Sequence, residues 1–275
     1  MRTRFALLLL PLFALLGCGP KPTEQTLATP GEPPLSDADA RTLAKKRLTE
    51  IVNGLHEHES THQQLPGGRS VVPGALSWRV HLLPFVGQEE LFKQFNLKEA
   101  WDSEQNKPLI EKMPAVYASP DKTAPAGQTY IQGFVGPHAF FASPPADPKA
   151  PFRGRSVAKS FPDGTSNVLA VAEAAEPVIW TKPDDLPFDG KELPKLGGVF
   201  PDGFHGVMAD GQVFFFPKDV TTDALLRSLL TIDGNDWIDF NSIRKANGMK
   251  ELEYRKPTPL PNPNGPKPPV AKPPG

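Results

Sequence analysis

The sequence predicts an α+β fold in which one long N-terminal helix packs on a mostly antiparallel sheet. Two observations support this prediction. Apolar residues recur at the spacing of one helical face early in the chain, between residues 44 and 55. Later segments of the chain are short, rich in β-branched and aromatic residues, and separated by turn residues, which is typical of strands.

The helix is predicted to begin after Ser36 and to end near His62. Ser36 is followed by Asp37 and Asp39, and this combination suits an N-cap and an acidic first turn. The apolar positions then follow the i, i+4, i+7, i+8, i+11 pattern: Ala44, Leu48, Ile51, Val52 and Leu55. Leu65-Pro66-Gly67-Gly68 ends the pattern, because proline and glycine break helices.

Shorter elements follow the helix. Segment 76–83 is predicted to be helical or extended, and segments 88–95, 106–113 and 222–230 are predicted to be helices. The predicted strands are 129–135, 168–172, 178–181, 206–209 and 212–216. The last two flank Asp210-Gly211, a dipeptide that favours a tight type I′ hairpin turn.

Residues 1–17 have the pattern of a lipoprotein signal peptide. Arg2 and Arg4 precede an apolar run over residues 5–16, which is shorter than the roughly 20 residues that a membrane span needs. The run ends in Leu15-Leu16-Gly17-Cys18, which resembles a bacterial lipobox, where a peptidase cuts before a lipid-modified cysteine. Cys18 is the only cysteine in the chain and is therefore the predicted lipid attachment residue. The alternative is an ordinary signal peptide that contains a cysteine.

Composition divides the rest of the chain into three parts. Residues 18–35 are rich in proline and predict a tether, residues 36–254 predict the folded domain, and residues 255–275 predict an extended tail rich in proline and lysine. The formal net charge is −1 and the domain has no basic stripe, so nucleic acid is not expected as a partner. We expect a lipid-anchored protein of the cell membrane or outer membrane that faces the periplasm or exterior.

Six segments, taken in order along the chain, resemble the DUF1559 family, whose pilin-like members are abundant in planctomycete bacteria. They are Leu55-His56 with His62 and Leu65-Pro66, then segments 77–85, 95–103, 163–167, 180–186 and 209–213. The resemblance implies a pilin-like domain outside the cytoplasm, and the family's function is unassigned. Members usually begin with a long hydrophobic pilin helix. Here a lipobox and a tether replace that helix, so assembly into a pilus is not expected.

His58-Glu59-Ser60-Thr61-His62 matches the H-E-x-x-H pattern of zinc-dependent hydrolases. Two histidines at i and i+4 share a helix face and can bind Zn²⁺, while the glutamate activates a bound water. Gln63 and Gln64 follow the second histidine, although buried zinc helices usually continue with apolar residues. We therefore interpret the segment as a solvated helix end, expect no cofactor and no enzyme, and keep the zinc hydrolase as the alternative.

Two further candidates have simpler interpretations. Residues 163–167 offer several oxygens that suit calcium or a sugar, but they also suit a tight turn before a strand. Glu173 and Glu176 near Trp180 suggest a glycosidase-like cleft, and the sheet near Trp180 suggests a sugar-binding or peptide-binding face. Solvated carboxylates are the simpler interpretation of this pair. An envelope protein or a polysaccharide remains the expected kind of partner beside the membrane.

Overall fold

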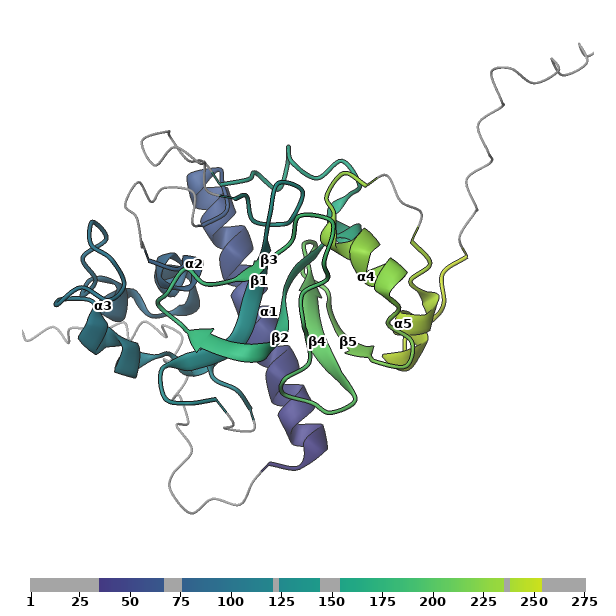
Figure 1. The fold of residues 1–275 in the computed structure, drawn as a ribbon, viewed down its shortest axis with the longest axis horizontal. Helices are drawn as coiled ribbons and strands as arrows, with labels where there is room; N and C mark the ends of the chain where they lie inside the picture. The colour runs from purple at the N-terminus through teal and green to yellow at the C-terminus, as the bar shows by residue number, and fades with distance from the viewer. Residues whose placement is uncertain (1–34, 67–75, 121–123, 144–153, 235–237, 254–275) are drawn as a thin grey trace, which may run out of the picture. The chain divides into compact units, whose positions relative to one another are not determined.

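A long helix and a five-stranded sheet form the framework of the domain (Figure 1). The structure is a computed structural model, and it describes residues 35–66, 76–120, 124–143, 154–234 and 238–253. The predicted signal peptide, most of the tether, Cys18 and the tail lie outside the described residues. The predicted α+β fold class is confirmed.

Helix α1 spans Asp37–His62, as its sequence pattern predicts. The Ser36 hydroxyl accepts a hydrogen bond from the backbone N–H of Asp39 at 3.2 Å, which caps the first turn. The helix ends at Gln63, which adopts a left-handed conformation with a φ of 60°. The buried face consists of residues at helical spacing: Ala40, Ala44, Leu48, Ile51, Val52, Gly54, Leu55 and His58.

The sheet has the strand order β3-β1-β2-β4-β5. Its strands are β1 (Gln128–Val135), β2 (Leu169–Ile179), β3 (Leu186–Pro187), β4 (Gly203–Met208) and β5 (Val213–Pro217). All neighbouring pairs are antiparallel except β1 and β3, which pair in parallel over two residues. The prediction of two separate strands at 168–172 and 178–181 was wrong. Strand β1 pairs with both segments, across a register shift, and they form the single strand β2.

The hairpin between β4 and β5 differs from the predicted type I′ turn. Such a turn needs positive φ at both central residues, and at Asp210-Gly211 only Gly211 has it, with a φ of 97°. The Gly211 N–H donates to the Met208 carbonyl at 2.9 Å, and the Met208 N–H donates to the Gln212 carbonyl at 2.8 Å. The connection is thus a three-residue loop, in which the glycine supplies the left-handed position.

Each of the shorter segments that was predicted to be helical contains a helix in the structure, but several of these helices are single turns. The shorter helices of the structure are α2 (Trp78–His81), η1 (Leu83–Val86), α3 (Glu89–Phe92), η2 (Lys107–Lys112), η3 (Ala115–Tyr117), η4 (Thr165–Asn167), α4 (Asp223–Leu230) and α5 (Asn241–Ala246). The predicted cap of α4 is confirmed, since the Thr222 hydroxyl accepts from the Leu225 N–H at 3.2 Å. Helices η3, η4 and α5 were not predicted.

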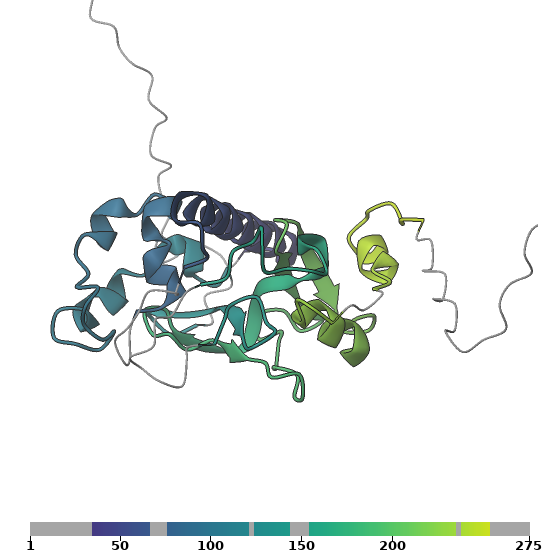
Figure 2. The ribbon, with the colours of Figure 1, turned by 90° about the horizontal axis from the view of Figure 1, so that it is seen from above.

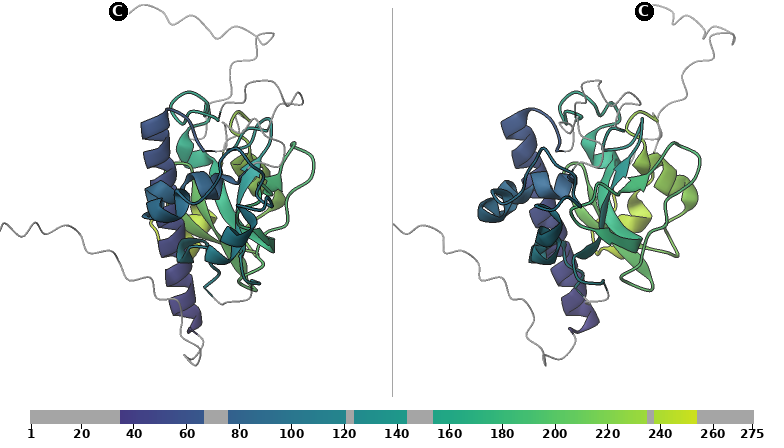
Figure 3. Two further views of the ribbon diagram at one scale, coloured as in Figure 1. Left: turned by 90° about the vertical axis from the view of Figure 1, so that its left-hand side faces the viewer. Right: turned by 60° about the vertical axis from the view of Figure 1, so that its left-hand side comes forward.

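Both faces of the sheet are covered, which separates the core into two main clusters. The larger cluster joins α1 to one face through residues such as Ile51, Leu55, Val171 and Val207. The second cluster joins α4 and α5 to the other face. Figures 2 and 3 show α1 on one side of the sheet and the two C-terminal helices away from it. Among the described residues, no helix is long and apolar enough to cross a membrane.

Candidate functional site

The two histidines of the H-E-x-x-H segment lie together at the end of α1. Their ring centroids are 4.5 Å apart, and both rings meet the edge or face of Phe85, at 5.2 Å from His58 and 5.8 Å from His62. His58 is only 8 % exposed, whereas His62 is exposed to solvent. His58 Nδ1 donates to the backbone carbonyl of Gln64 at 3.0 Å, because a carbonyl can only accept.

The glutamate of the same segment is occupied elsewhere. Glu59 Oε1 accepts from the Ser156 hydroxyl at 3.1 Å and from the Val157 N–H at 3.2 Å. The Leu65 N–H also donates to the Arg155 carbonyl at 2.7 Å, so the end of α1 is attached to this loop. In a zinc hydrolase the glutamate must reach the metal-bound water. The contacts of Glu59 are instead those of a residue that holds two chain segments together.

A third histidine, His81, lies at the end of α2 beside the pair. Burial, followed by the nearby charge of His62, lowers the pKa of His81 to about 4. His81 is therefore neutral near neutral pH. Even so, no group of three or more histidine, cysteine, aspartate or glutamate side chains in the described parts of the chain has a metal-binding arrangement. Within the part of the chain that the structure describes, the end of α1 thus offers a histidine pair and not a three-ligand catalytic metal site.

The alternative of a cleft around Glu173, Glu176 and Trp180 does not agree with the structure, and the simpler interpretation of solvated carboxylates holds for Glu176 but is wrong for Glu173. Trp180 is fully buried and donates from Nε1 to the Ile110 carbonyl at 2.9 Å, so its ring belongs to the core. Glu173 is buried too, and its Oε2 accepts from the backbone N–H and from Nδ1 of His205, at 2.7 and 3.1 Å. Glu176 alone is exposed. The three side chains do not line a common surface, and the buried Trp180 ring offers no surface to a sugar or peptide.

A small pocket lies between α1 and the sheet beside Glu173. Its walls come from α1, β1, β2 and the segments around Ser119 and Val199. Its volume of about 10 Å³ is room for one water molecule, not for a substrate.

The loop at residues 163–167 is ordered by its own hydrogen bonds. Gly164 has a φ of 86°, the Asn167 amide donates to the Asp163 carbonyl at 2.7 Å, and the Asp210 N–H donates to the Thr165 carbonyl at 3.1 Å. These contacts form a turn that leads into β2 and holds the β4–β5 loop beside it. The turn interpretation accounts for the segment without a bound ion or sugar.

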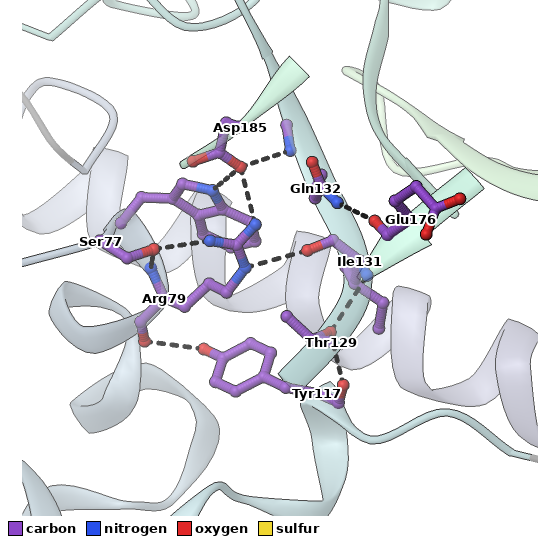
Figure 4. A network of polar contacts seen from close by, with 10 residues as sticks. Ser77, Arg79, Tyr117, Thr129, Ile131, Gln132, Glu176 and Asp185 are labelled. Atoms are coloured by element: carbon purple, nitrogen blue, oxygen red, sulfur yellow. Dashed lines mark hydrogen bonds and ion pairs between the residues drawn. The ribbon is translucent and has the colours of Figure 1, made fainter. Parts of the chain in front are cut away.

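Arg79 lies at the centre of a buried polar network that sequence reasoning missed (Figure 4). Its guanidinium donates to Asp185 Oδ1 at 2.7 Å, to the Ser77 hydroxyl at 2.7 Å and to the Ile131 carbonyl at 2.9 Å. The side chains of Arg79 and Asp185 are 0 % and 6 % exposed. The available signal was a serine, an arginine and a histidine inside an otherwise apolar segment, 76–86, but nothing in the sequence identified the partners of Ser77 and Arg79.

Asp185 accepts hydrogen bonds from two donors besides Arg79. The same oxygen accepts from Trp78 Nε1 at 3.0 Å and from the Gly133 N–H at 2.9 Å. Burial raises the pKa of the Asp185 carboxyl, whereas the Arg79 guanidinium and the other donors oppose that shift because they stabilise the ionised form. The network thus joins α2, β1 and the segment before β3.

Tyr117 and Thr129 extend the network on its other side. The Tyr117 hydroxyl donates to the Arg79 carbonyl at 2.9 Å, and the Thr129 hydroxyl donates to the Tyr117 carbonyl at 2.6 Å. Burial raises the pKa of the Tyr117 hydroxyl, so this group stays protonated and remains a donor. Arg79, Tyr117 and Thr129 are fully buried and the Asp185 side chain is nearly so, and we interpret the network as a determinant of the fold and not as a catalytic site.

These features define an α+β domain with a long N-terminal helix, a mostly antiparallel sheet and a buried arginine–aspartate network at one end. Residues 40–194 match the family described as "Protein of unknown function (DUF1559)". This match covers more than half of the 275 residues, and the chain belongs to the DUF1559 family. No curated protein and no solved structure matches the chain.

The matched residues include most of the features above. The histidine pair, Arg79, Asp185 and the loop at 163–167 all lie within residues 40–194. Strands β4 and β5 and helices α4 and α5 follow the matched region, and Cys18 precedes it. The match therefore confirms the resemblance, while the signal peptide and the lipid attachment stay predictions.

Proposed function

We propose that the chain is an extracytoplasmic lipoprotein, anchored through Cys18, with a non-enzymatic structural or binding role in the cell envelope. One observation carries the anchoring. An apolar leader too short for a membrane span ends at the only cysteine of the chain, directly before a segment rich in proline. Acyl chains on that cysteine would hold the protein at the membrane, since each buried CH₂ contributes about 0.8 kcal/mol.

The non-enzymatic part of the proposal is supported by the contacts of the candidate catalytic groups. Glu59 accepts hydrogen bonds from Ser156 and Val157, and Glu173 accepts two from His205. Asp185 is neutralised by Arg79. Each of these carboxylates connects parts of the fold, and the pocket beside Glu173 is too small for a substrate. An envelope protein or a polysaccharide is the partner that we propose for the surface of the domain.

Replacing Cys18 with serine tests the anchor. Serine has no thiol to accept the lipid, so we expect the Cys18→Ser variant to lose labelling by palmitate and to leave the membrane fraction. The measurement is metabolic labelling followed by cell fractionation and immunoblotting. Thr23→Ser is the matched control, because it makes an equally small change in the tether. Palmitate labelling that persists in Cys18→Ser would contradict the proposal.

A further inference from the structure

We propose that the outer edge of strand β5 is a pairing surface for β5 of a second copy of this chain, and that Asn247, directly after α5, keeps this edge closed in the single chain. The proposal goes beyond the lipid-anchored function and does not depend on it. The contact that carries it is a side-chain amide that takes the place of a neighbouring strand.

The Asn247 side chain makes the hydrogen bonds that a neighbouring strand would make. Its Oδ1 accepts from the Phe215 N–H at 2.8 Å, and its Nδ2 donates to the Phe215 carbonyl at 2.7 Å. In an antiparallel ladder, one residue of the adjacent strand exchanges both of these bonds with the residue opposite. Nδ2 also donates to the Ile243 carbonyl at 2.7 Å, which fixes the amide. Asn247 therefore occupies the position of a further strand.

Strand β5 lies at one end of the strand order and has outward backbone groups. Alternate residues of an edge strand direct their N–H and carbonyl groups away from the sheet. Phe215 does so, as its bonds to Asn247 show, and Val213 and Pro217 share that direction because they are two positions away on either side. At the opposite edge, β3 has only two residues and ends in proline, and both features oppose strand pairing. The edge of β5 is thus the one that another strand can extend.

Helix α5, which lies beside β5, depends on that strand for its stability (Figure 1). It has six residues, and a helix of this length is not stable alone in water. The Phe240 ring packs against the rings of Phe214 and Phe216, with centroids 4.8 and 5.9 Å away, and Ile243 is buried in the second core cluster. Units with few buried apolar contacts open at a lower free-energy cost than the whole fold. We therefore expect α5 to lift from β5 while the rest of the domain stays folded.

A second copy of β5 replaces the contacts that are lost when α5 lifts. In an antiparallel pair centred on Phe215, the two Phe215 residues exchange both hydrogen bonds. Each Val213 N–H then meets the Pro217 carbonyl of the other copy, and this register uses no N–H at the proline. Phe214 lies directly opposite Phe216 of the other copy, so an aromatic cross-strand pair replaces the aromatic contact with the lifted segment. The arrangement is twofold symmetric, as most protein dimers are.

The direct test is sedimentation equilibrium of the full chain in a density-matched detergent solution, in which only the protein contributes to the measured mass. We expect the parent chain to be a monomer. Asn247→Asp keeps the size of the side chain but replaces the amide donor by a carboxylate oxygen, which faces the carbonyls of Phe215 and Ile243. We expect this variant to dimerise about tenfold or more tightly than the parent chain.

Two further variants separate the edge from other surfaces. Asn53→Asp is the matched control, because it makes the same chemical change at an exposed position of α1, and it should associate as the parent does. Phe240→Ala weakens the attachment of α5 through a different contact, so it should also promote dimers. Circular dichroism verifies that each variant keeps the fold.

Hydrogen exchange at the Phe215 amide locates the interface. In the parent chain, the bond to Asn247 should protect this amide at every protein concentration. In Asn247→Asp, we expect the protection to be lost in the dilute monomer and regained in the concentrated dimer. Protection that stays lost in the dimer would overturn the proposal, because the copies would then meet at another surface.

The sedimentation measurement can contradict the proposal in two ways. One is that folded Asn247→Asp and folded Phe240→Ala both stay monomeric at the highest concentration. The other is that Asn53→Asp associates as strongly as Asn247→Asp, since the effect would then follow the added charge and not the edge of β5.

Discussion

Replacing Asp185 with alanine is expected to lower the free energy of unfolding by about 3–5 kcal/mol, because it leaves the buried Arg79 guanidinium without its counter-charge. The same change removes the acceptor of Trp78 Nε1 and of the Gly133 N–H. Buried donors without partners carry a cost of their own. Chemical denaturation followed by tryptophan fluorescence measures the effect.

The neighbouring aspartate provides the control. Asp184 pairs with Lys182 at the surface, where its side chain is 50 % exposed. Asp184→Ala is therefore expected to change the free energy of unfolding by only about 0.5 kcal/mol or less. A paired replacement, Arg79→Met with Asp185→Leu, should be more stable than Asp185→Ala, since it removes both charges. Equal small losses for Asp184→Ala and Asp185→Ala would contradict the structural role of the network.

Acidification is expected to destabilise the protein through His81. In the folded state its pKa is lowered to about 4, whereas an unfolded chain has the ordinary value near 6.5. The unfolded state therefore binds an additional proton between these values. The contribution of His81 is complete above about pH 6.5 and is lost as the pH falls towards 4, with a total of up to about 3 kcal/mol.

Unfolding curves at several pH values, with a chelator present, measure this effect. Glutamine at position 81 cannot titrate, so His81→Gln should lose less stability than the parent chain between about pH 6.5 and 4. His138→Gln is the control, because the His138 side chain is 57 % exposed and lies elsewhere on the surface. An identical pH dependence in His81→Gln and the parent would show that His81 does not contribute.

The main elements of the fold could be predicted because their signals are local. The cap at Ser36 and the apolar spacing that follows depend on neighbouring residues, and α1 has the predicted limits. Strand β2 was divided incorrectly, because Glu173 and Glu176 interrupt its apolar pattern although pairing with β1 keeps it extended. Strand β3 has two residues, one of them proline, and is defined only by its partner β1.

The candidate sites were harder to predict, because they depend on which distant residues meet. The sequence identified His58 and His62 as neighbours on one helix face, but it could not place Glu59 against Ser156, which is 97 positions away. It also could not show that Arg79 meets Asp185 across 106 positions. Trp180 and Glu173 looked like site residues because of their chemistry, and their burial is a property of the assembled core.

The intact mass of protein extracted from membranes of the producing cell shows whether Cys18 carries a lipid. The proposal requires a chain that begins at Cys18 and carries a diacylglyceryl group on its thiol. A chain that still begins at Met1, or one that begins at Cys18 with an unmodified thiol, would contradict it.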